Sequence, residues 1–544
     1  MPAIPSPTNT VPLVDTVTTP ERRAGYEAAG RWTEDTLSRK LAEAARRVPD
    51  RAAVIDGATG RTHTYAELER DANRVADHLA RRLGVRAGEV VAVQLPNWYE
   101  TVAVQMGVLR LGAVLNPMLP IYREREMAHM LRTARTRVLI TPATYRRHDH
   151  SAMAERLRAD VECLEHTLTI ADPEGNGLPA QPFWAQDADR PFTGATASAV
   201  SELLFTSGTE ALPKAVMHTE QTASVGTRLA ATALGITDAD VVWMPSPIGH
   251  STGFNYGVRM AVYHGLPLVL QDRWDGAAAA DLVQRHRISY TVAASTFLSD
   301  LVRAAGESGN DLSSLRLFSS GGAPVPTALI EQAEALGVPV LRLYGSTELL
   351  VATWNRPESP REKRARTDGC ALPDVELEVR VDGRPVLGEP GEIHVRGPST
   401  CVGFFADPER TAATIDPAGW VASGDLGVLD DDGYLTIVGR KKEIIIRGGL
   451  NVAPRELEDL IGEMPQVARV AVIPLPDDRL GEIGCACVVP APGATLELDD
   501  VVTHLNRRGV ARFKHPERLV VLAELPTTPT GKVQKHELVR ALTE

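Results

Sequence analysis

Short apolar segments alternate with helix-like segments from Tyr65 onward, and this alternation constrains the fold more than any other feature. The apolar segments lie at residues 90–95, 138–140, 167–170, 241–244, 267–270, 290–293 and 315–319. Continuous short apolar runs are typical of strands that are buried on both faces, as in parallel sheets covered by helices. The pattern therefore predicts an α/β fold built from βα units around largely parallel sheets.

The pattern of expected secondary structure changes after about residue 375. Strand-like runs at 375–381, 391–396, 427–430 and 434–438 are separated by Gly/Asp turns, which predicts a barrel-like or antiparallel subdomain. The last hundred residues show a small α+β pattern, and the first 30 are rich in Pro and Thr. We therefore divide the chain into a flexible N-terminal arm (1–30), a large N-terminal domain (31–440) and a small mobile C-terminal domain (441–544).

Length and charge narrow the function classes. The chain has 544 residues, more than one core usually organises, and a formal net charge of −12, which disfavours a general nucleic-acid or anionic-membrane binder. The five cysteines are scattered and odd in number, as expected for free thiols in a reducing cytoplasm. No apolar run approaches the roughly 18 residues that span a bilayer, and the N-terminus lacks a signal-peptide pattern. We expect a cytoplasmic protein, either a monomer or a homodimer.

A loop suited to phosphate follows the apolar run at 203–205. Thr206, Ser207, Gly208 and Thr209 are small and polar, and Lys214 adds a positive charge. Small residues let backbone N–H groups and hydroxyls close around phosphate oxygens. The spacing differs from that of the P-loop NTPases.

Five further segments carry chemistry. Residues 344–348 offer an aromatic ring and a carboxylate, and residues 419–425 place Asp425 in a turn where it could accept ribose hydroxyls. Residues 439–443 form a charged stretch where a linker would lie. Residues 447–452 are glycine-rich, and residues 526–532 project Lys532 from a loop stiffened by Pro and Gly.

Six motifs in this order resemble those of the adenylate-forming superfamily, which includes acyl-CoA synthetases, peptide-synthetase adenylation domains and luciferases. The resemblance covers residues 35 to 544. It implies an N-terminal domain of two βαβ-type sheets plus the barrel-like piece. The stretches around His218, His250 and Arg447 resemble acyl-CoA ligases of the medium-chain and cyclohexanecarboxylate type.

The resemblance also implies a role for individual residues. Tyr344 would stack on adenine, Thr347 would bind phosphate, Glu348 with Thr206 would hold Mg²⁺, and Lys532 would be the catalytic lysine. The remaining nucleotide contacts would come from Ser207, Gly208, Thr209, Lys214, Gly322, Ala323, Pro324, Gly345, Ser346 and the ribose pair Asp425 and Arg440. Lys442 would be the hinge between domains, and Gly448 and Gly449 would line a thiol tunnel. The acid pocket would contain His250, with a gating and catalytic role, and Ser251, Thr252, Gly253, Phe254, Ser295, Ser320 and Gly321.

The implied activity is ATP-dependent activation of a carboxylic acid as an acyl-adenylate, followed by transfer to CoA. Two alternatives keep the adenylation step: loading of a carrier-protein thiol, and activation of nitrite to diazotise an aromatic amine. A non-catalytic nucleotide-binding module is disfavoured because both Lys532 and Glu348 are present. The short polar residues of the acid pocket favour a small or hydroxylated ring acid. One departure is Glu210-Ala211, which replaces the usual Thr-Gly of the phosphate loop and which we expect to point away from the triphosphate.

Overall fold

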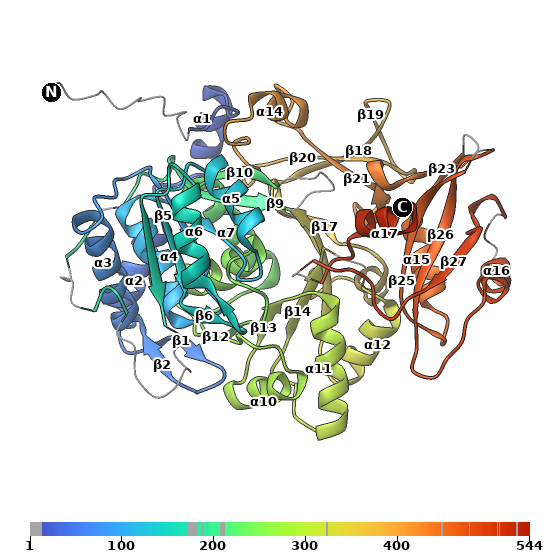
Figure 1. Ribbon diagram of the computed structural model, residues 1–544, viewed down its shortest axis with the longest axis horizontal. Helices are drawn as coiled ribbons and strands as arrows, with labels where there is room; N and C mark the ends of the chain where they lie inside the picture. Colours follow the sequence, from blue (N-terminus) through green and yellow to red (C-terminus); the bar gives the residue numbers. More distant parts are fainter. Residues whose placement is uncertain are drawn as a thin grey trace.

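A computed structural model shows a large N-terminal α/β body with a smaller C-terminal domain at one end (Figure 1). The structure describes residues 14–171, 182–185, 190–192, 194–206, 213–322, 325–447, 450–477, 479–508, 510, 512–528 and 531–543. Within these residues no helix is long and apolar enough to cross a membrane. All five cysteines are free.

A nine-stranded sheet forms one half of the N-terminal body. Its strands, in spatial order, are β17 (Cys370–Ala371), β16 (Leu350–Trp354), β15 (Val340–Ser346), β14 (Leu317–Gly321), β13 (Tyr290–Val292), β11 (Val242–Met244), β12 (Leu268–Leu270), β1 (Ala52–Asp56) and β2 (Thr62–Thr64). The strands from β15 to β1 pair in parallel, whereas β2, β16 and β17 are antiparallel additions at the two edges.

A six-stranded sheet forms the other half. Its order is β10 (Lys214–Thr219), β9 (Val200–Thr206), β4 (Val114–Pro117), β3 (Val90–Val93), β5 (Val138–Pro142) and β8 (His166–Ile170). Only β10 is antiparallel to its neighbour. The two largely parallel sheets confirm the α/β class, because strands buried on both faces need continuous apolar runs.

The helices of the N-terminal body connect and cover these strands. They are α1 (Pro20–Ala28), α2 (Leu37–Arg47), α3 (Tyr65–Arg81), α4 (Tyr99–Leu111), α5 (Glu124–Thr133), α6 (His150–Asp160), α7 (Glu220–Leu234), α8 (Ser251–Gly253), the π-helix η1 (Phe254–Arg259), α9 (Met260–His264), α10 (Gly276–His286), α11 (Ser295–Ser308), α12 (Thr327–Ala335), α13 (Arg361–Arg366) and α14 (Pro408–Thr414). A two-stranded ribbon, β6 (Thr144–Tyr145) with β7 (His148–Asp149), precedes α6.

The region after residue 375 is an antiparallel sheet, as its Gly/Asp turns predicted. Its order is β19 (Arg384–Val386), β18 (Glu376–Val381), β20 (Gly391–Arg396), β21 (Val421–Leu429) and β22 (Leu435–Arg440). The turn residue Asp382 has a φ of 49° and is followed by Gly383 at 76°, left-handed values that favour Gly and Asp in tight hairpins.

The C-terminal domain combines a sheet with helices. The sheet order is β24 (Leu450–Val452), β23 (Ile445–Arg447), β26 (Gly481–Pro490) and β25 (Val467–Asp477), and β27 (Arg518–Val521) also pairs with β26. The helical elements are the 3-10 turns η2 (Lys441–Glu443) and η3 (Arg512–Lys514), and α15 (Pro454–Gly462), α16 (Leu498–Arg507) and α17 (Lys535–Thr543).

The N-terminal segment differs from the expected flexible arm. Residues 1–13 lie outside the described residues, but α1 follows directly after Thr19, whose side chain accepts a hydrogen bond from the Arg22 amide. Thr followed by Pro at the first helical position is a helix-start signal, and the sequence interpretation missed it. Arg23 anchors the segment by pairing with Asp15 at 2.9 Å and by donating to Gln221 at 3.0 Å.

A buried ion cluster joins four elements of the N-terminal body. Arg259, at the end of η1, is fully buried and pairs with Glu202 on β9 and, at 2.9 Å, with Glu220 on α7. Burial alone would lower the pKa of Arg259, but the two carboxylates raise it, so the guanidinium stays charged. Asn255 donates to Glu202 at 3.2 Å, and the Leu37 amide donates to Glu220 at 2.8 Å. The cluster therefore ties α2, β9, α7 and η1 together.

Arg259→Met should destabilise the N-terminal domain by about 3–5 kcal/mol, because it leaves two buried carboxylates without their cation. The measurement is the urea midpoint of the N-terminal transition. Arg303→Met is the matched control, since Arg303 is largely exposed and its ion pairs in the described part of the chain lie within α11. Equal midpoints for the two variants would show that the cluster does not stabilise the fold.

Candidate active site

A cleft of about 280 Å³ lies between the two sheets and the C-terminal domain. The residues that line it come from distant parts of the chain: Leu119, Tyr122, Phe205, Thr206, Lys214, Ser246, Pro247, His250, Ser251, Thr252, Tyr256, Val292, Ala293, Ala294, Phe297, Gly321, Gly322, Leu343, Gly345, Ser346, Thr347, Glu348, Leu350, Val351, Ser423, Asp425, Arg440, Thr528 and Lys532. Most of the residues that the motifs singled out in the described part of the chain therefore meet in one place.

The phosphate-loop residues lie at the tip of a hairpin. Thr206 ends β9, Lys214 begins β10, and the two residues face each other in the antiparallel ladder. Both line the cleft. Ser207, Gly208 and Thr209, together with Glu210 and Ala211, lie outside the described residues.

Asp425 is held by two partners. Its carboxylate accepts a hydrogen bond from the Tyr344 hydroxyl at 2.8 Å and pairs with Arg440 Nε at 2.8 Å. The expected turn is wrong: Asp425 lies within β21, opposite Arg440 on β22. The strand continues through the glycine segment despite two irregularities: Gly424 has a φ of 72°, and the register shifts between Leu426 and Gly427. Asp425 and Arg440 thus face the cleft together, as the ribose prediction requires.

Tyr344 lies behind the cleft wall. Only 6 % of Tyr344 is exposed, and its neighbours Leu343 and Gly345, not Tyr344 itself, line the cleft. Its clearest contact is the hydrogen bond that orients Asp425. Stacking on adenine stays a prediction.

The turn between β15 and β16 brings hydroxyl and carboxylate groups to the cleft. Ser346, Thr347 and Glu348 line it in sequence. Gly345 must lack a side chain, because a Cβ there would lie 1.9 Å from the Leu350 carbonyl oxygen. Buried His218 donates from Nε2 to the Thr347 carbonyl at 2.8 Å and fixes the turn from behind. Carboxylate and hydroxyl oxygens are the ligands that Mg²⁺ accepts, so Glu348 and Thr206 fit the ion chemically.

Lys532 reaches the cleft from the C-terminal domain. Its backbone closes a tight loop: the Lys532 amide donates to Thr528 Oγ1 at 3.1 Å, and the Thr528 amide donates to the Lys532 carbonyl at 2.7 Å. Lys532 is exposed by surface area, yet the many protein atoms around its side chain in the cleft partly desolvate it. Desolvation, with help from Arg440, lowers the pKa of Lys532 to about 8, while Asp425 opposes the shift.

The acid pocket is only partly the one expected. His250, Ser251, Thr252 and Gly321 line the cleft, but the other four expected residues do not: Gly253, Phe254, Ser295 and Ser320. Phe254 is fully buried, with the Arg259 guanidinium 5.6 Å from its ring centre, because the π-helical turn directs it into the core.

Sequence reasoning missed several pocket walls. They are Leu119, Tyr122, Tyr256, Val292, Phe297, Leu343 and Val351. Tyr256 is fixed by the Val351 amide, which donates to its hydroxyl at 2.9 Å. Tyr256 belongs to the stretch around His250 that resembles acyl-CoA ligases, but it was not assigned to the pocket; the other six are ordinary core types that a sequence motif does not mark.

The remaining expected residues cannot all be placed. Gly322 lines the cleft, whereas Ala323, Pro324, Gly448 and Gly449 lie outside the described residues. Lys442 lies in η2, directly between β22 and β23. Its role as a hinge stays a prediction.

Two family models cover most of the chain. The model described as AMP-binding enzyme matches residues 41–405, and the model described as AMP-binding enzyme C-terminal domain matches residues 456–532. The chain therefore belongs to the AMP-binding enzyme family, the adenylate-forming superfamily, in its acyl-CoA synthetase branch. It is an AMP-forming ligase that uses ATP.

Individual relatives agree with this assignment. The chain is 35% identical to a medium-chain fatty-acid–CoA ligase of Escherichia coli strain K12, covering 96% of this chain and 94% of that protein. It is 34% identical to a salicyl-AMP ligase / salicyl-S-ArCP synthetase of Mycobacterium tuberculosis, covering 96% and 93%. A solved anthranilate CoA ligase with bound anthranoyl-AMP superimposes with a TM-score of 0.84 at 26% identity, covering 93% of this chain and 97% of that one.

The lowered pKa of Lys532 predicts an alkaline limb in the pH profile. The ammonium form is present below pH 8 and is lost as the pH rises through about 8. The value of kcat/KM for ATP, which reports groups of the free enzyme, should therefore fall above that pH. Lys532→Arg keeps a cation that does not titrate in this range, so its residual activity should lack the limb. The same limb in both proteins would assign the titration to another group.

Proposed function

We propose that this ligase activates a small carboxylic acid with Mg·ATP as an acyl-adenylate, releases pyrophosphate, and then transfers the acyl group to the thiol of CoA. The observation that carries the proposal is the meeting of Lys532, Glu348 and the Asp425–Arg440 pair in one cleft, next to a pocket lined largely by uncharged side chains. Nucleotide and acid would thus lie side by side.

The first half-reaction joins two anions, and the cleft supplies charges of the opposite sign. The carboxylate oxygen attacks the α-phosphorus, an O–P bond forms, and pyrophosphate leaves with the electrons of the broken P–O bond. A general base is not required, because the acid is already ionised. Lys532 and Lys214 approach the cleft from opposite domains and can offset the charge that develops on the phosphoryl oxygens.

Mg²⁺ is proposed to bind Glu348 and Thr206, where it would neutralise phosphate charge as a Lewis acid. Asp425 accepts from Tyr344 and Arg440, so its carboxylate is oriented before ATP arrives. Preorganised groups cost no reorganisation when the nucleotide binds. Asp425 and Arg440 would then position the ribose and, through it, the α-phosphate.

The second half-reaction needs a different surface, because a thiolate attacks the acyl carbon and AMP leaves. In this structure Lys532 faces the cleft, which is the arrangement suited to adenylation. We propose that the C-terminal domain rotates about Lys442 to withdraw Lys532 and to bring Gly448 and Gly449 to a thiol tunnel. A carrier-protein thiol is the second candidate acceptor, since a relative at 34% identity is named as a salicyl-S-ArCP synthetase.

The acid pocket favours a compact, ring-containing acid. Tyr256 and Phe297 contribute aromatic faces, and Val292 and Val351 contribute aliphatic ones. The cations of the cleft are Lys214, Arg440 and Lys532, and all three belong to the predicted nucleotide end, so a second carboxylate on the acid would lack a partner among the described walls. With its free thiols, the protein is also proposed to act in the cytoplasm.

Lys532→Ala tests the proposal by separating the half-reactions. Acid-dependent pyrophosphate release should fall by about 10²–10³-fold, because one charged contact to the transition state is lost. Transfer of the acyl group from a supplied acyl-adenylate to CoA should change little. Lys441→Ala is the matched control, since Lys441 is largely exposed and pairs with Glu392.

The acids for this assay come from a pyrophosphate-release screen over carboxylic acids and nitrite, with and without CoA. If pyrophosphate were released with nitrite but with none of the carboxylic acids, nitrite would be the substrate instead of a carboxylic acid. An equal loss of both half-reactions in Lys532→Ala would show that this lysine is structural, and the assignment of the site would fail.

A further inference from the structure

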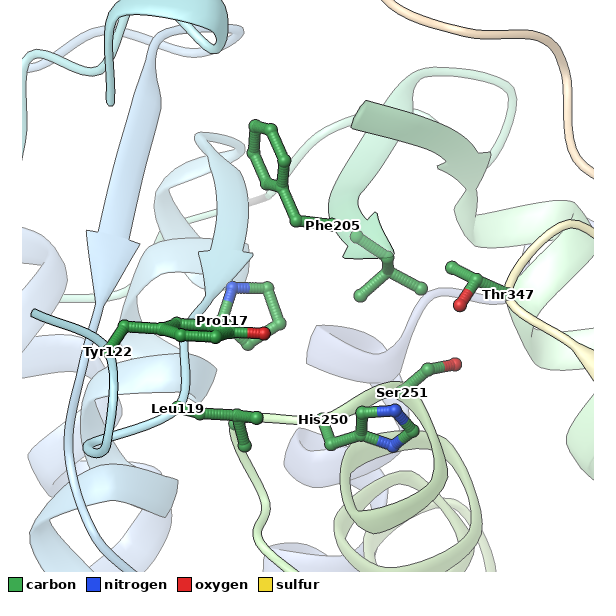
Figure 2. A pocket seen from close by; sticks show the side chains of 9 residues that line it. Pro117, Leu119, Tyr122, Phe205, His250, Ser251 and Thr347 are labelled. Carbon is green, nitrogen blue, oxygen red and sulfur yellow. The ribbon is translucent and has the colours of Figure 1, made fainter. Parts of the chain in front are cut away.

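A small side cavity opens beside the main cleft. It encloses about 10 Å³, and its walls are Pro117, Leu119, Tyr122, Leu204, Phe205, Gly249, His250, Ser251 and Thr347. Six of these residues also line the main cleft, so the two spaces are neighbours. Figure 2 shows the side chains of Tyr122, His250 and Thr347 arranged around this space. The volume is that of about one water molecule or one small substituent.

The side cavity presents a defined hydrogen-bond donor. His250 Nδ1 accepts a hydrogen bond from the Thr252 amide at 3.2 Å, so Nδ1 carries no proton. Burial lowers the pKa of His250 to about 4, which keeps the ring neutral. The single ring proton therefore resides on Nε2, the nitrogen that is free to donate into the cavity.

Hydroxyl groups complete the polar lining. Tyr122, Ser251 and Thr347 each contribute one, and in the described part of the chain none of these hydroxyls donates to or accepts from another protein group. No carboxylate, lysine or arginine is among the described walls of the side cavity, and its one titratable imidazole, His250, is neutral. The side cavity suits an uncharged polar atom. An alkyl group would leave the donors unpaired, and a charged group would find no counter-charge among these walls.

The wall that carries Tyr122 is rigid. Gln94 Nε2 donates to the carbonyls of Leu119 and Tyr122, each at 3.1 Å. Arg123 donates to three successive carbonyls of the same loop, at Pro120, Ile121 and Tyr122. These bonds fix the backbone that carries Tyr122 before any ligand enters.

The side cavity adjoins the part of the cleft in which the reaction is proposed to occur. Thr347 belongs to both spaces, and it lies between Ser346 and Glu348, which line the main cleft with Lys532. With the acid placed as in the proposed function, a substituent that enters the side cavity would lie close to its carboxylate.

We propose that the acid carries a small uncharged oxygen, a hydroxyl or a carbonyl, next to the carbon that bears its carboxylate, and that this oxygen accepts a hydrogen bond from His250 Nε2 and contacts the Tyr122 hydroxyl. This inference rests on the proposed function, because it describes the acid activated in the same cleft. It defines a substrate class: compact acids with an adjacent oxygen, as opposed to plain alkyl or dicarboxylic acids.

The test compares acids of matched size in acid-dependent pyrophosphate release, without a thiol. The series is benzoate, 2-hydroxybenzoate, 2-methylbenzoate and benzene-1,2-dicarboxylate. Because hydroxyl and methyl groups are nearly equal in size, the ratio of kcat/KM for the 2-hydroxy acid to that for the 2-methyl acid isolates the contribution of the hydrogen bond. We expect kcat/KM for 2-hydroxybenzoate to exceed that for 2-methylbenzoate by at least about tenfold, since a site built around polar donors rejects analogues that leave them unpaired. The dicarboxylate should be the poorest substrate.

Two variants assign the preference to the side cavity. Tyr122→Phe and His250→Phe should each reduce the hydroxy-to-methyl ratio severalfold. Tyr263→Phe is the matched control, because its hydroxyl contacts Asp35 away from the cleft, and it should keep the ratio. Equal use of the hydroxy and methyl acids, or variants that alter only the later thiol step, would overturn the inference. If no acid in any screen released pyrophosphate, the proposed function itself would fail.

Discussion

The buried guanidinium of Arg259 is the interaction on which the arrangement of the cleft depends. It pairs with Glu202 on β9 and Glu220 on α7, and all three side chains are buried. The strand β9 leads within four residues to Thr206, and η1, which ends at Arg259, carries Tyr256 into the cleft. Two carboxylates would not stay buried and ionised at this position without the cation. The same ion cluster therefore holds the strand that leads to Thr206 against the π-helix that carries Tyr256.

A second set of contacts connects this body to the C-terminal domain. Asp425 and Arg440 pair across β21 and β22, and the chain then enters η2 and the C-terminal domain. Lys532 returns from that domain to the same cleft and lies close enough for Arg440 and Asp425 to influence its pKa. Positive charge is thus gathered at the end where phosphate is expected, whereas the side cavity near His250 offers neutral donors. This division of charge is the physical basis for separate nucleotide and acid sites.

The sequence predicted those features that depend on local pattern. Apolar runs such as 138–140 became parallel strands because full burial demands continuous apolar residues, and the motif residues Glu348 and Lys532 meet in the cleft. Features set by tertiary context were missed. Asp425 lies in a strand because β21 pairs with β20 and β22 on both sides, although Gly424 before it has a positive φ. Phe254 is buried because the π-helix turns it toward Arg259. Tyr122 reaches the cleft only because the loop after β4 folds back onto it, and single-sequence periodicity carries no signal for such a contact.

Isotope transfer tests the central claim, adenylate formation, most directly. The acid that is used best would be labelled with ¹⁸O in its carboxylate and incubated with ATP and CoA, and the AMP produced would be analysed by mass spectrometry. If the carboxylate attacks the α-phosphorus and a thiol then attacks the acyl carbon, the bridging oxygen leaves with AMP. The account predicts AMP that carries one ¹⁸O atom from the acid. Unlabelled AMP, or ADP with label in inorganic phosphate, would contradict it.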